Sequence, residues 1–339
     1  MACLAVTKSF LAVCSRNKAI VTTLSGKLCL KYEVLEKEVE EKADTNGGSN
    51  ANNGKGSLYI VDCKFSPSGK YFAICTSSKM LLVWDTSTWS LEFNRHIPRK
   101  PMKLVFSKTE DAPLIADKAG DVHRIYLKDE KVEHLIGHLS VILDMVLTSD
   151  DTRIITTDRD GKIRMSHFPN CYNIDKFFMA HGSFVSSVAL DASEKYLLSI
   201  DGDGNLFLWN KVLGSHCDII NLPNEDGSVP RRICVDDERR VFIILDGMKK
   251  ILHYHIKDEK LEKQEDITLA HVPLDIQCNG KDLWVLQHSK SEPVLSFHFG
   301  LESKFSEMKI SCFNEKKEFL DEPLKLEPWK CQSWSDNQP

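Results

Sequence analysis

The sequence lacks the features of membrane proteins and of secreted disulfide-rich proteins. No apolar run exceeds about six residues in the 339-residue chain, whereas a membrane-spanning helix needs about 20. The first ten residues contain no charged segment followed by a long apolar stretch, so they predict no signal peptide. The eleven cysteines are an odd number, and no two form a Cys-x-x-Cys pair. We therefore expect neither a disulfide framework nor a zinc site, and a reducing compartment fits best.

An excess of positive charge is also missing. Lys and Arg total 44 against 49 Asp and Glu, which gives a formal net charge of −5. A simple polybasic nucleic-acid binder is therefore not expected. Hydrophobic residues make up 42% and charged residues 27% of the chain, which is ordinary for a globular protein and sufficient for a large core.

The motifs of common enzymes are absent as well. The sequence has no Gly-rich loop leading from a strand into a helix, no G-x-S-x-G and no H-E-x-x-H. The run 201–205 reads Asp-Gly-Asp-Gly-Asn but lacks the acidic ligand that closes a calcium loop. We interpret it as a β-turn. The sequence thus predicts no catalytic residue, no metal and no cofactor held by this chain.

What the sequence does contain is an internal repeat. One copy begins at Gly137-His138 and reaches its hairpin turn at Asp160-Gly161. A second begins at Ala180-His181, 43 residues after the first histidine, and turns at Asp203-Gly204. A third spans 61–85 and ends in Trp84-Asp85. Fainter copies bring the number to seven; they cover 1–35, 98–128, 228–264 and 268–300.

Short β-branched and aromatic runs separated by turn residues predict four strands in each copy. One such sheet cannot bury both faces alone, but a ring of stacked sheets can. We therefore predict an all-β protein, a seven-bladed WD40 β-propeller over residues 1–300. The range 36–57 interrupts the pattern and predicts a flexible insertion, and 301–339, with Trp329 and Trp334, predicts a partly disordered C-terminal extension.

Several polar residues recur at positions where WD repeats form an internal hydrogen-bonded network. No nucleophile recurs beside them, so we assign them a structural role rather than a catalytic one. The predicted network residues are His138, His181, Ser199, Asp203 and Trp209, together with Asp160 as a second candidate carboxylate.

Three segments resemble one particular family. They are 116–122 (ADKAGDV), 137–140 (GHLS) and 158–164 (DRDGKIR). Ordinary WD repeats require neither Lys118 nor the Asp-Arg-Asp string. Over roughly residues 100–210 the chain resembles the WD-repeat non-catalytic subunit of the eukaryotic tRNA (guanine-N7)-methyltransferase.

The resemblance implies a division of labour. In that family the propeller does not methylate, and a separate catalytic subunit carries S-adenosylmethionine and forms N7-methylguanine in the tRNA variable loop. The resemblance therefore implies a heterodimer, contact with tRNA through the complex, and a location in the nucleus, with the cytoplasm as a second location. The short apolar runs predict no membrane association.

The candidate partner contacts lie in two of the repeats. Lys118 and Arg159 occupy equivalent turns of neighbouring blades, which places them on one rim, and strand alternation directs Lys162 and Arg164 away from Ile163. The family resemblance places Arg164 against an acidic residue of the catalytic subunit. A solvated charged rim is the alternative. The predicted partner contacts are Lys118, Arg159, Asp160, Lys162 and Arg164, and the predicted tRNA contacts are Arg99 and Lys100, for which a merely solvated surface is an equal alternative.

Two other functions remain open from the sequence. One is an adaptor of another complex, such as the substrate receptor of a ubiquitin ligase. Such receptors often carry Arg two residues after the Trp-Asp pair, whereas Trp84-Asp85 is followed by Thr86-Ser87 here. The other is an enzyme built on a propeller, whose acidic residues would crowd the central channel.

Overall fold

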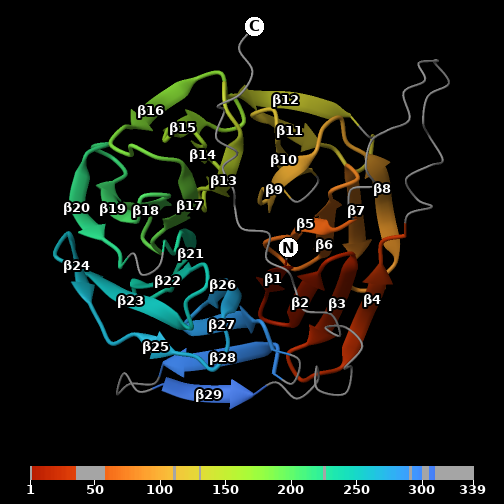
Figure 1. The fold of residues 1–339 in the computed structure, drawn as a ribbon. Coiled ribbons are helices and arrows are strands. Elements are labelled where there is room, and N and C mark those ends of the chain that lie inside the picture. The colour runs from red at the N-terminus through yellow and green to blue at the C-terminus, as the bar shows by residue number, and fades with distance from the viewer. Residues whose placement is uncertain are drawn as a thin grey trace, which may run out of the picture.

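The computed structural model describes residues 2–35, 58–109, 112–129, 131–223, 227–289, 292–299 and 305–309. These residues form seven antiparallel sheets arranged around one axis, with the N-terminus beside that axis (Figure 1). We number the sheets as blades 1 to 7 in chain order. Within the described part of the chain, no helix has the length and apolar character needed to cross a membrane.

The strands follow a regular order from the axis outward. Blades 1 and 2 comprise β1 (Ala2–Val6), β2 (Phe10–Ser15), β3 (Lys18–Thr23), β4 (Leu28–Glu33), β5 (Ile60–Phe65), β6 (Tyr71–Thr76), β7 (Met80–Asp85) and β8 (Leu91–His96). Blades 3 and 4 comprise β9 (Pro101–Phe106), β10 (Pro113–Asp117), β11 (Asp121–Ile125), β12 (Val132–Gly137), β13 (Ile142–Leu147), β14 (Arg153–Asp158), β15 (Ile163–His167) and β16 (Ile174–Phe178). Blades 5 to 7 comprise β17 (Val185–Leu190), β18 (Tyr196–Asp201), β19 (Asn205–Asn210), β20 (His216–Asn221), β21 (Pro230–Val235), β22 (Arg240–Leu245), β23 (Lys250–Lys257), β24 (Lys260–Lys263), β25 (Ile267–Thr268), β26 (Pro273–Asn279), β27 (Asp282–Gln287), β28 (Val294–Phe299) and β29 (Phe305–Lys309).

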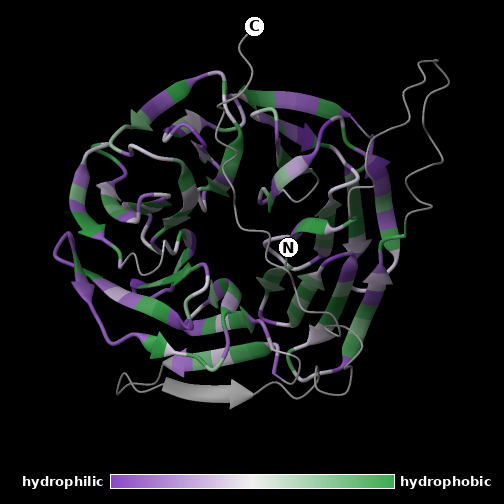
Figure 2. Cartoon of the chain, in the orientation of Figure 1, coloured by the Kyte–Doolittle hydropathy of each residue, from purple (hydrophilic) through white to green (hydrophobic). Residues whose placement is uncertain are grey.

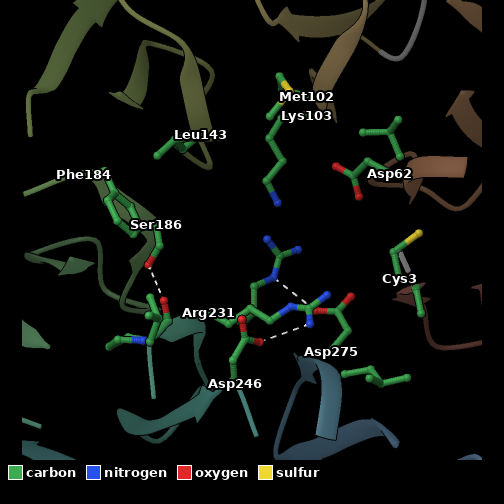
Figure 3. Close-up of a pocket in the computed structure, with 16 residues that line it drawn as sticks. Cys3, Asp62, Met102, Lys103, Leu143, Phe184, Ser186, Arg231, Asp246 and Asp275 are labelled. Carbon is green, nitrogen blue, oxygen red and sulfur yellow. Dashed lines mark hydrogen bonds and ion pairs between the residues drawn. The ribbon is translucent and has the colours of Figure 1, made fainter. Parts of the chain in front are cut away.

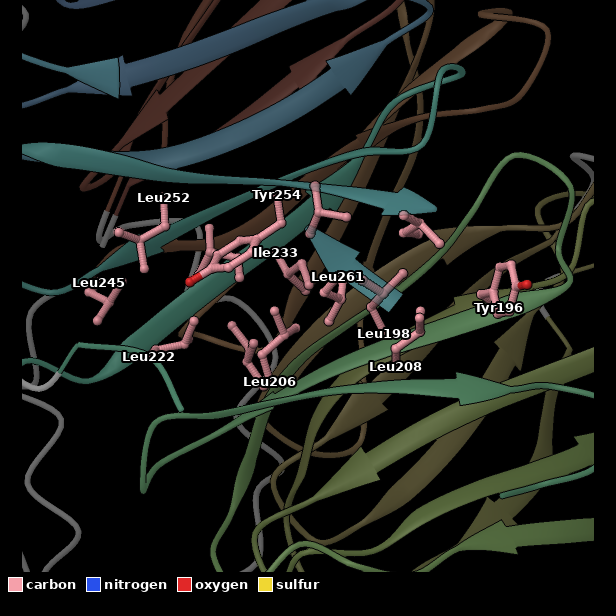
Figure 4. Close-up of a cluster of buried hydrophobic side chains, with 14 of the residues drawn as sticks. Tyr196, Leu198, Leu206, Leu208, Leu222, Ile233, Leu245, Leu252, Tyr254 and Leu261 are labelled. Atoms are coloured by element: carbon pink, nitrogen blue, oxygen red, sulfur yellow. The ribbon is translucent and has the colours of Figure 1, made fainter. Parts of the chain in front are cut away.

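The core lies between neighbouring blades rather than inside one of them. Between blades 5 and 6, for example, Leu198 and Leu208 belong to the same buried cluster as Leu252 and Tyr254 (Figure 4). The outermost strands, such as β8 and β12, carry more hydrophilic residues than the inner strands (Figure 2). This gradient explains the sequence pattern, because only the inner and middle strands are covered on both faces.

The ring closes without a shared strand. Blade 1 uses only the first four strands and blade 7 only the last four. Innermost strand β1 packs against innermost strand β26, and the Leu4 amide donates a 2.9 Å hydrogen bond to Asp275 Oδ2. The same contact joins blades 2 and 3, where Asp62 accepts from the Leu104 amide at 3.1 Å. Burial of these carboxylates is therefore offset by backbone donors of the adjacent blade.

The predicted all-β, seven-bladed propeller is confirmed, with one correction at its C-terminal boundary. Strand β29 pairs with β28, so blade 7 continues to Lys309 rather than ending at residue 300. A fourth strand was missed there because the sequence of 301–309 carries no hairpin signal as clear as Asp-Gly. The predicted insertion at 36–57, the remainder of the predicted extension from 310, and Trp329 and Trp334 lie outside the described residues.

Candidate functional site

The predicted internal network is most complete in blade 5. His181 Nδ1 lies 2.7 Å from Asp201 Oδ2, and its Nε2 lies 2.7 Å from Ser199 Oγ. Trp209 Nε1 donates to the same hydroxyl at 2.8 Å. Asp203, the predicted carboxylate, is exposed and takes no part through its side chain, which is a correction. The carboxylate of the network belongs to Asp201, the first residue of the turn. At that position its Oδ1 also accepts hydrogen bonds from the amides of Asp203 and Asn205, which lie two and four residues later.

Blade 4 repeats this arrangement with one change. His138 Nδ1 lies 3.0 Å from Asp158 Oδ2, and His138 Nε2 lies 2.8 Å from Thr156 Oγ1. Burial raises the pKa of Asp158, but the hydrogen bond from His138 and backbone donors outweigh it and lower that pKa below its usual value. Ser166 stands where blade 5 has its tryptophan, and Arg164 Nε donates to Ser166 Oγ at 2.9 Å.

The residues predicted as partner contacts surround one short loop, residues 137–141, which we call the 137–141 segment. Asp160 accepts a 2.8 Å hydrogen bond from Ser140, so it is not the carboxylate of the internal network. The Arg159 amide donates to Val141 O at 3.0 Å, and the Lys162 amide donates to Asp158, the partner of His138, at 2.9 Å. The structure thus brings residues from two turns and a strand together around this loop.

The turn that carries Lys118 approaches the same loop from blade 3. Its turn contains Gly120, which has a φ of +97°. A Cβ atom at Gly120 would lie 2.5 Å from Ser140 O and 2.7 Å from His138 O, so only glycine permits this approach. The side chain of Lys118 itself is exposed.

Arg164 differs from the sequence expectation. Its side chain points away from buried Ile163, yet it is only half-exposed, because its NH2 group donates to Cys171 O at 2.9 Å and its NH1 group to Gly137 O at 3.3 Å. Burial lowers the pKa of the guanidinium. Arg164 of blade 4 is therefore hydrogen-bonded to Gly137, the first residue of the 137–141 segment. Arg159 and Lys118 are the cations that project into solvent.

Three exposed apolar side chains beside these cations were missed from the sequence. Leu139, at the tip of the 137–141 segment, is 99% exposed. Phe177 lies directly opposite Arg164 in the β15–β16 register, so the two share one face of the blade, and Met179 follows just after β16. Both are exposed. The sequence did contain one indication of this surface: Leu139 follows the histidine of one repeat, where the matching repeat has Gly182.

The predicted tRNA contacts extend this surface towards blade 2. Lys100 O accepts a 2.9 Å hydrogen bond from the Lys118 amide, and the Lys100 ammonium donates to Tyr59 Oη at 2.7 Å. Arg99 is exposed. Exposed Lys79, whose carbonyl accepts the Ile97 amide at 2.8 Å, was not singled out from the sequence. We call the following set the basic rim: Lys79, Arg99, Lys100, Lys118, Arg159 and Lys162.

The central channel carries charges that are paired within the ring. Lys103 Nζ lies 3.3 Å from Asp144 Oδ1. Arg232 Nε lies 3.3 Å from Asp275 Oδ1, and both of these residues line the pocket drawn in Figure 3. Burial raises the pKa of Asp144, but Lys103, Arg232 and hydrogen bonds outweigh it and lower the value to about 2. Asp62 accepts a backbone hydrogen bond from the neighbouring blade. These contacts link the inner strands of different blades, so the acidic residues of the channel have a structural role.

Comparison with known families and proteins agrees with this architecture. Residues 128–298 match the family model described as "tRNA methyltransferase TRM82 WD40 domain", and 52–85 match "WD domain, G-beta repeat". The chain belongs to the TRM82 WD40 family. A chain of the solved structure "Crystal Structure of Mitotic Checkpoint Complex" aligns with a TM-score of 0.71 at 15% identity over 87% of this chain and 88% of that one, which supports the fold alone.

Relatives of this TRM82-family chain carry consistent names. The Xenopus laevis protein "tRNA (guanine-N(7)-)-methyltransferase non-catalytic subunit wdr4" is 31% identical over 80% of this chain and 73% of its own length. The Homo sapiens WDR4 subunit is 30% identical, over 76% of this chain and 66% of its own length. The Candida glabrata TRM82 subunit is 25% identical over 75% of each. These names confirm the predicted resemblance and agree with the expectation of a chain that is not itself an enzyme.

Proposed function

We propose that this chain is the scaffold of a tRNA (guanine-N7)-methyltransferase and binds the catalytic subunit, as a heterodimer, through the 137–141 segment and its surroundings. The observation that carries the proposal is the exposed Leu139 between two solvent-facing cations, Lys118 and Arg159. Leu139 adds to the exposed Phe177 and Met179, and apolar surface rimmed by charged residues is typical of a protein–protein contact.

The chemistry of this surface defines the partner surface that it fits. Leu139, Phe177 and Met179 would enter an apolar depression, while the surrounding cations would face acidic side chains. Arg164 acts on the loop, because its bond to Gly137 O fixes the base from which Leu139 projects. The catalytic subunit would bring S-adenosylmethionine, and this chain would hold it in one orientation in the nucleus.

Replacing the apolar tip tests the proposal. In a titration of the purified catalytic subunit followed by calorimetry, we expect Leu139→Asp to weaken binding by 10-fold or more, roughly the loss of one buried anchor. Adding Arg159→Glu to Leu139→Asp should weaken binding of the catalytic subunit further. The matched control is Leu213→Asp on the blade 5 loop, where the leucine is also exposed. Unchanged affinity in Leu139→Asp, with a wild-type melting temperature, would place the interface elsewhere.

The basic rim tests the second part of the function. A tRNA bound by the heterodimer would meet phosphate-binding cations at Arg99 and Lys100, next to Lys118. We expect Arg99→Glu/Lys100→Glu to weaken tRNA binding several-fold at low salt and to flatten its salt dependence, with the heterodimer intact by gel filtration. Equal tRNA affinity for the variant and the wild-type complex would remove these residues from the tRNA surface.

A further inference from the structure

Blade 3 carries the acid of the internal network without its usual partners. Asp117 begins the β10–β11 turn, as Asp158 and Asp201 begin theirs in blades 4 and 5. In those blades the second carboxylate oxygen meets the histidine of the incoming loop at 3.0 and 2.7 Å. Asp117 Oδ2 is buried and finds no hydrogen-bond partner in the part of the chain that the structure describes.

The reason lies in two apolar substitutions. The Ile97 amide donates to Lys79 O, just as the His138 amide donates to Gly120 O, so Ile97 occupies the position of the network histidine. Ile115, two residues before Asp117, stands where blade 5 has Ser199. Both isoleucines are buried. Neither side chain can donate a hydrogen bond to the acid, so Asp117 Oδ2 lies next to other groups.

Two histidines and a second acid surround Asp117. His123 Nε2 lies 3.4 Å from Asp117 Oδ2, and His134 Nε2 lies 3.0 Å from Asp121 Oδ1. The two histidines are direct neighbours in the β11–β12 register, with ring centroids 5.4 Å apart. His123 Nδ1 is also buried without a hydrogen-bond partner among the described residues. Two buried polar atoms therefore lack partners in one small cluster, which is unusual in a folded protein.

These four side chains offer the ligands that zinc prefers outside thiolate sites. Imidazole nitrogens and carboxylate oxygens bind zinc at about 2.0–2.2 Å, which separates neighbouring tetrahedral ligands by about 3.3 Å. The two histidine–aspartate pairs, at 3.4 and 3.0 Å, have this spacing already. Ligand atoms of Asp117, Asp121 and His123 lie within 4.8 Å of one another. His134 is outside that group of three but lies beside Asp121, so a shared ion requires the three to draw closer and the exposed His134 side chain to turn toward them.

We propose that Asp117, Asp121, His123 and His134 form a binding site for one divalent transition-metal ion of the zinc type. Access is from solvent, because side-chain exposure rises from 2% at Asp117 to 54% at His134. Asp117 Oδ1 accepts hydrogen bonds from the Ala119 and Asp121 amides at 2.8 and 3.1 Å. These bonds fix the carboxylate so that Oδ2 is the oxygen that would coordinate the metal ion.

The site adjoins the 137–141 segment. Asp121 pairs with Gly137 across β11 and β12, and a Cβ atom at Gly137 would lie 3.3 Å from Asp121 Oδ1. An ion held here would tie the end of β12 to the β10–β11 turn.

The buried Cys3, Cys14 and Cys63 form a second group, whose sulfur atoms lie within 4.8 Å of one another. Cobalt(II) is the probe that distinguishes a nitrogen–oxygen site from a thiolate site of this kind. The full chain, metal-stripped and kept reduced, is titrated with Co²⁺ and followed by visible absorption and calorimetry. We expect one ion to bind with visible bands of a nitrogen–oxygen site and no near-ultraviolet thiolate band. Zn²⁺ should displace it and raise the melting temperature.

Two variants and one control locate the ion. We expect His134→Ala, which removes an exposed side chain, and His123→Phe, the residue found as Phe207 at the equivalent position of blade 5, each to weaken Co²⁺ binding at least 10-fold. The control is His298→Ala, because His298 is also an exposed histidine beside an aspartate, with Nδ1 2.5 Å from Asp282 Oδ1, but belongs to blade 7. It should bind like the wild type. Absence of saturable binding, a thiolate band, or wild-type affinity in both His134→Ala and His123→Phe overturns the proposal.

Discussion

Blades 3 and 5 share one turn design but use it differently. In blade 5 the turn acid Asp201 is met by His181, and Ser199 links that histidine to Trp209. In blade 3 Ile97 replaces the histidine, and the equivalent acid, Asp117, has one oxygen without a hydrogen-bond partner among the described residues. The backbone around both acids is held by the same amide hydrogen bonds.

The difference teaches how a repeat fold acquires special sites. A saturated network such as that of blade 5 contributes stability and has no capacity left for a ligand. A network that has lost its histidine keeps the turn, because the amides still hold the acid, but its remaining oxygen can serve another group. Variation among the blades therefore indicates where binding chemistry can reside.

The largest expected effect comes from breaking the complete network. Asp201→Ala would leave His181 Nδ1 and the turn amides buried without their acceptor, and the loss of one partner of a buried pair costs about 3–5 kcal/mol. We expect the free energy of unfolding in urea to fall by that amount.

Two further variants provide comparisons for this loss of unfolding free energy. Asp203→Ala removes an exposed carboxylate and should change stability by no more than about 0.5 kcal/mol. Asp117→Ala, measured in a chelator, removes hydrogen bonds mainly to two amides and should cost about 1–3 kcal/mol. If Asp117→Ala cost as much as Asp201→Ala, the contrast between the two blades would not hold.

A smaller effect follows from converting blade 3 into a copy of blade 5. In Ile97→His/Ile115→Ser the new imidazole would reach Asp117 as His181 reaches Asp201. Because Asp117 Oδ2 would then be occupied, we expect Co²⁺ affinity to fall more than 10-fold, about 1.4 kcal/mol. Circular dichroism checks that the double variant folds. Undiminished Co²⁺ binding in the folded variant would show that Asp117 is not a ligand.

The smallest expected effect is a pH dependence of the free energy of unfolding. Burial raises the pKa of Asp201, but hydrogen bonds from His181 and Asn205 outweigh it, so the pKa lies below its usual value. The folded form thus gains stability above the unfolded pKa of about 3.9 and loses it as the pH falls through the lower, folded value. The stability gap between wild type and Asp201→Asn should narrow between pH 6 and pH 3. Leu198→Ala, which removes no titratable group, should keep a constant gap.

Much of the fold could be predicted because its signals are local. The 43-residue spacing of His138 and His181 and the Asp-Gly turns specify hairpins within single blades. The last strand, β29, was missed because its pairing with β28 is reached through a longer, less distinctive connection. The network acid was placed two residues late in both clear copies, since sequence spacing does not show which turn residue points inward.

The sequence by itself determined the repeat, the seven blades and the family, because each depends on residues close together in the chain. Only the tertiary structure decided what the polar residues contact. It bonds Arg164 to Gly137 and Cys171, exposes Leu139, and places His123 beside Asp117 and His134 beside Asp121. These contacts join residues from separate strands, loops or blades, and their geometry arises only when the hydrophobic faces of the blades pack together.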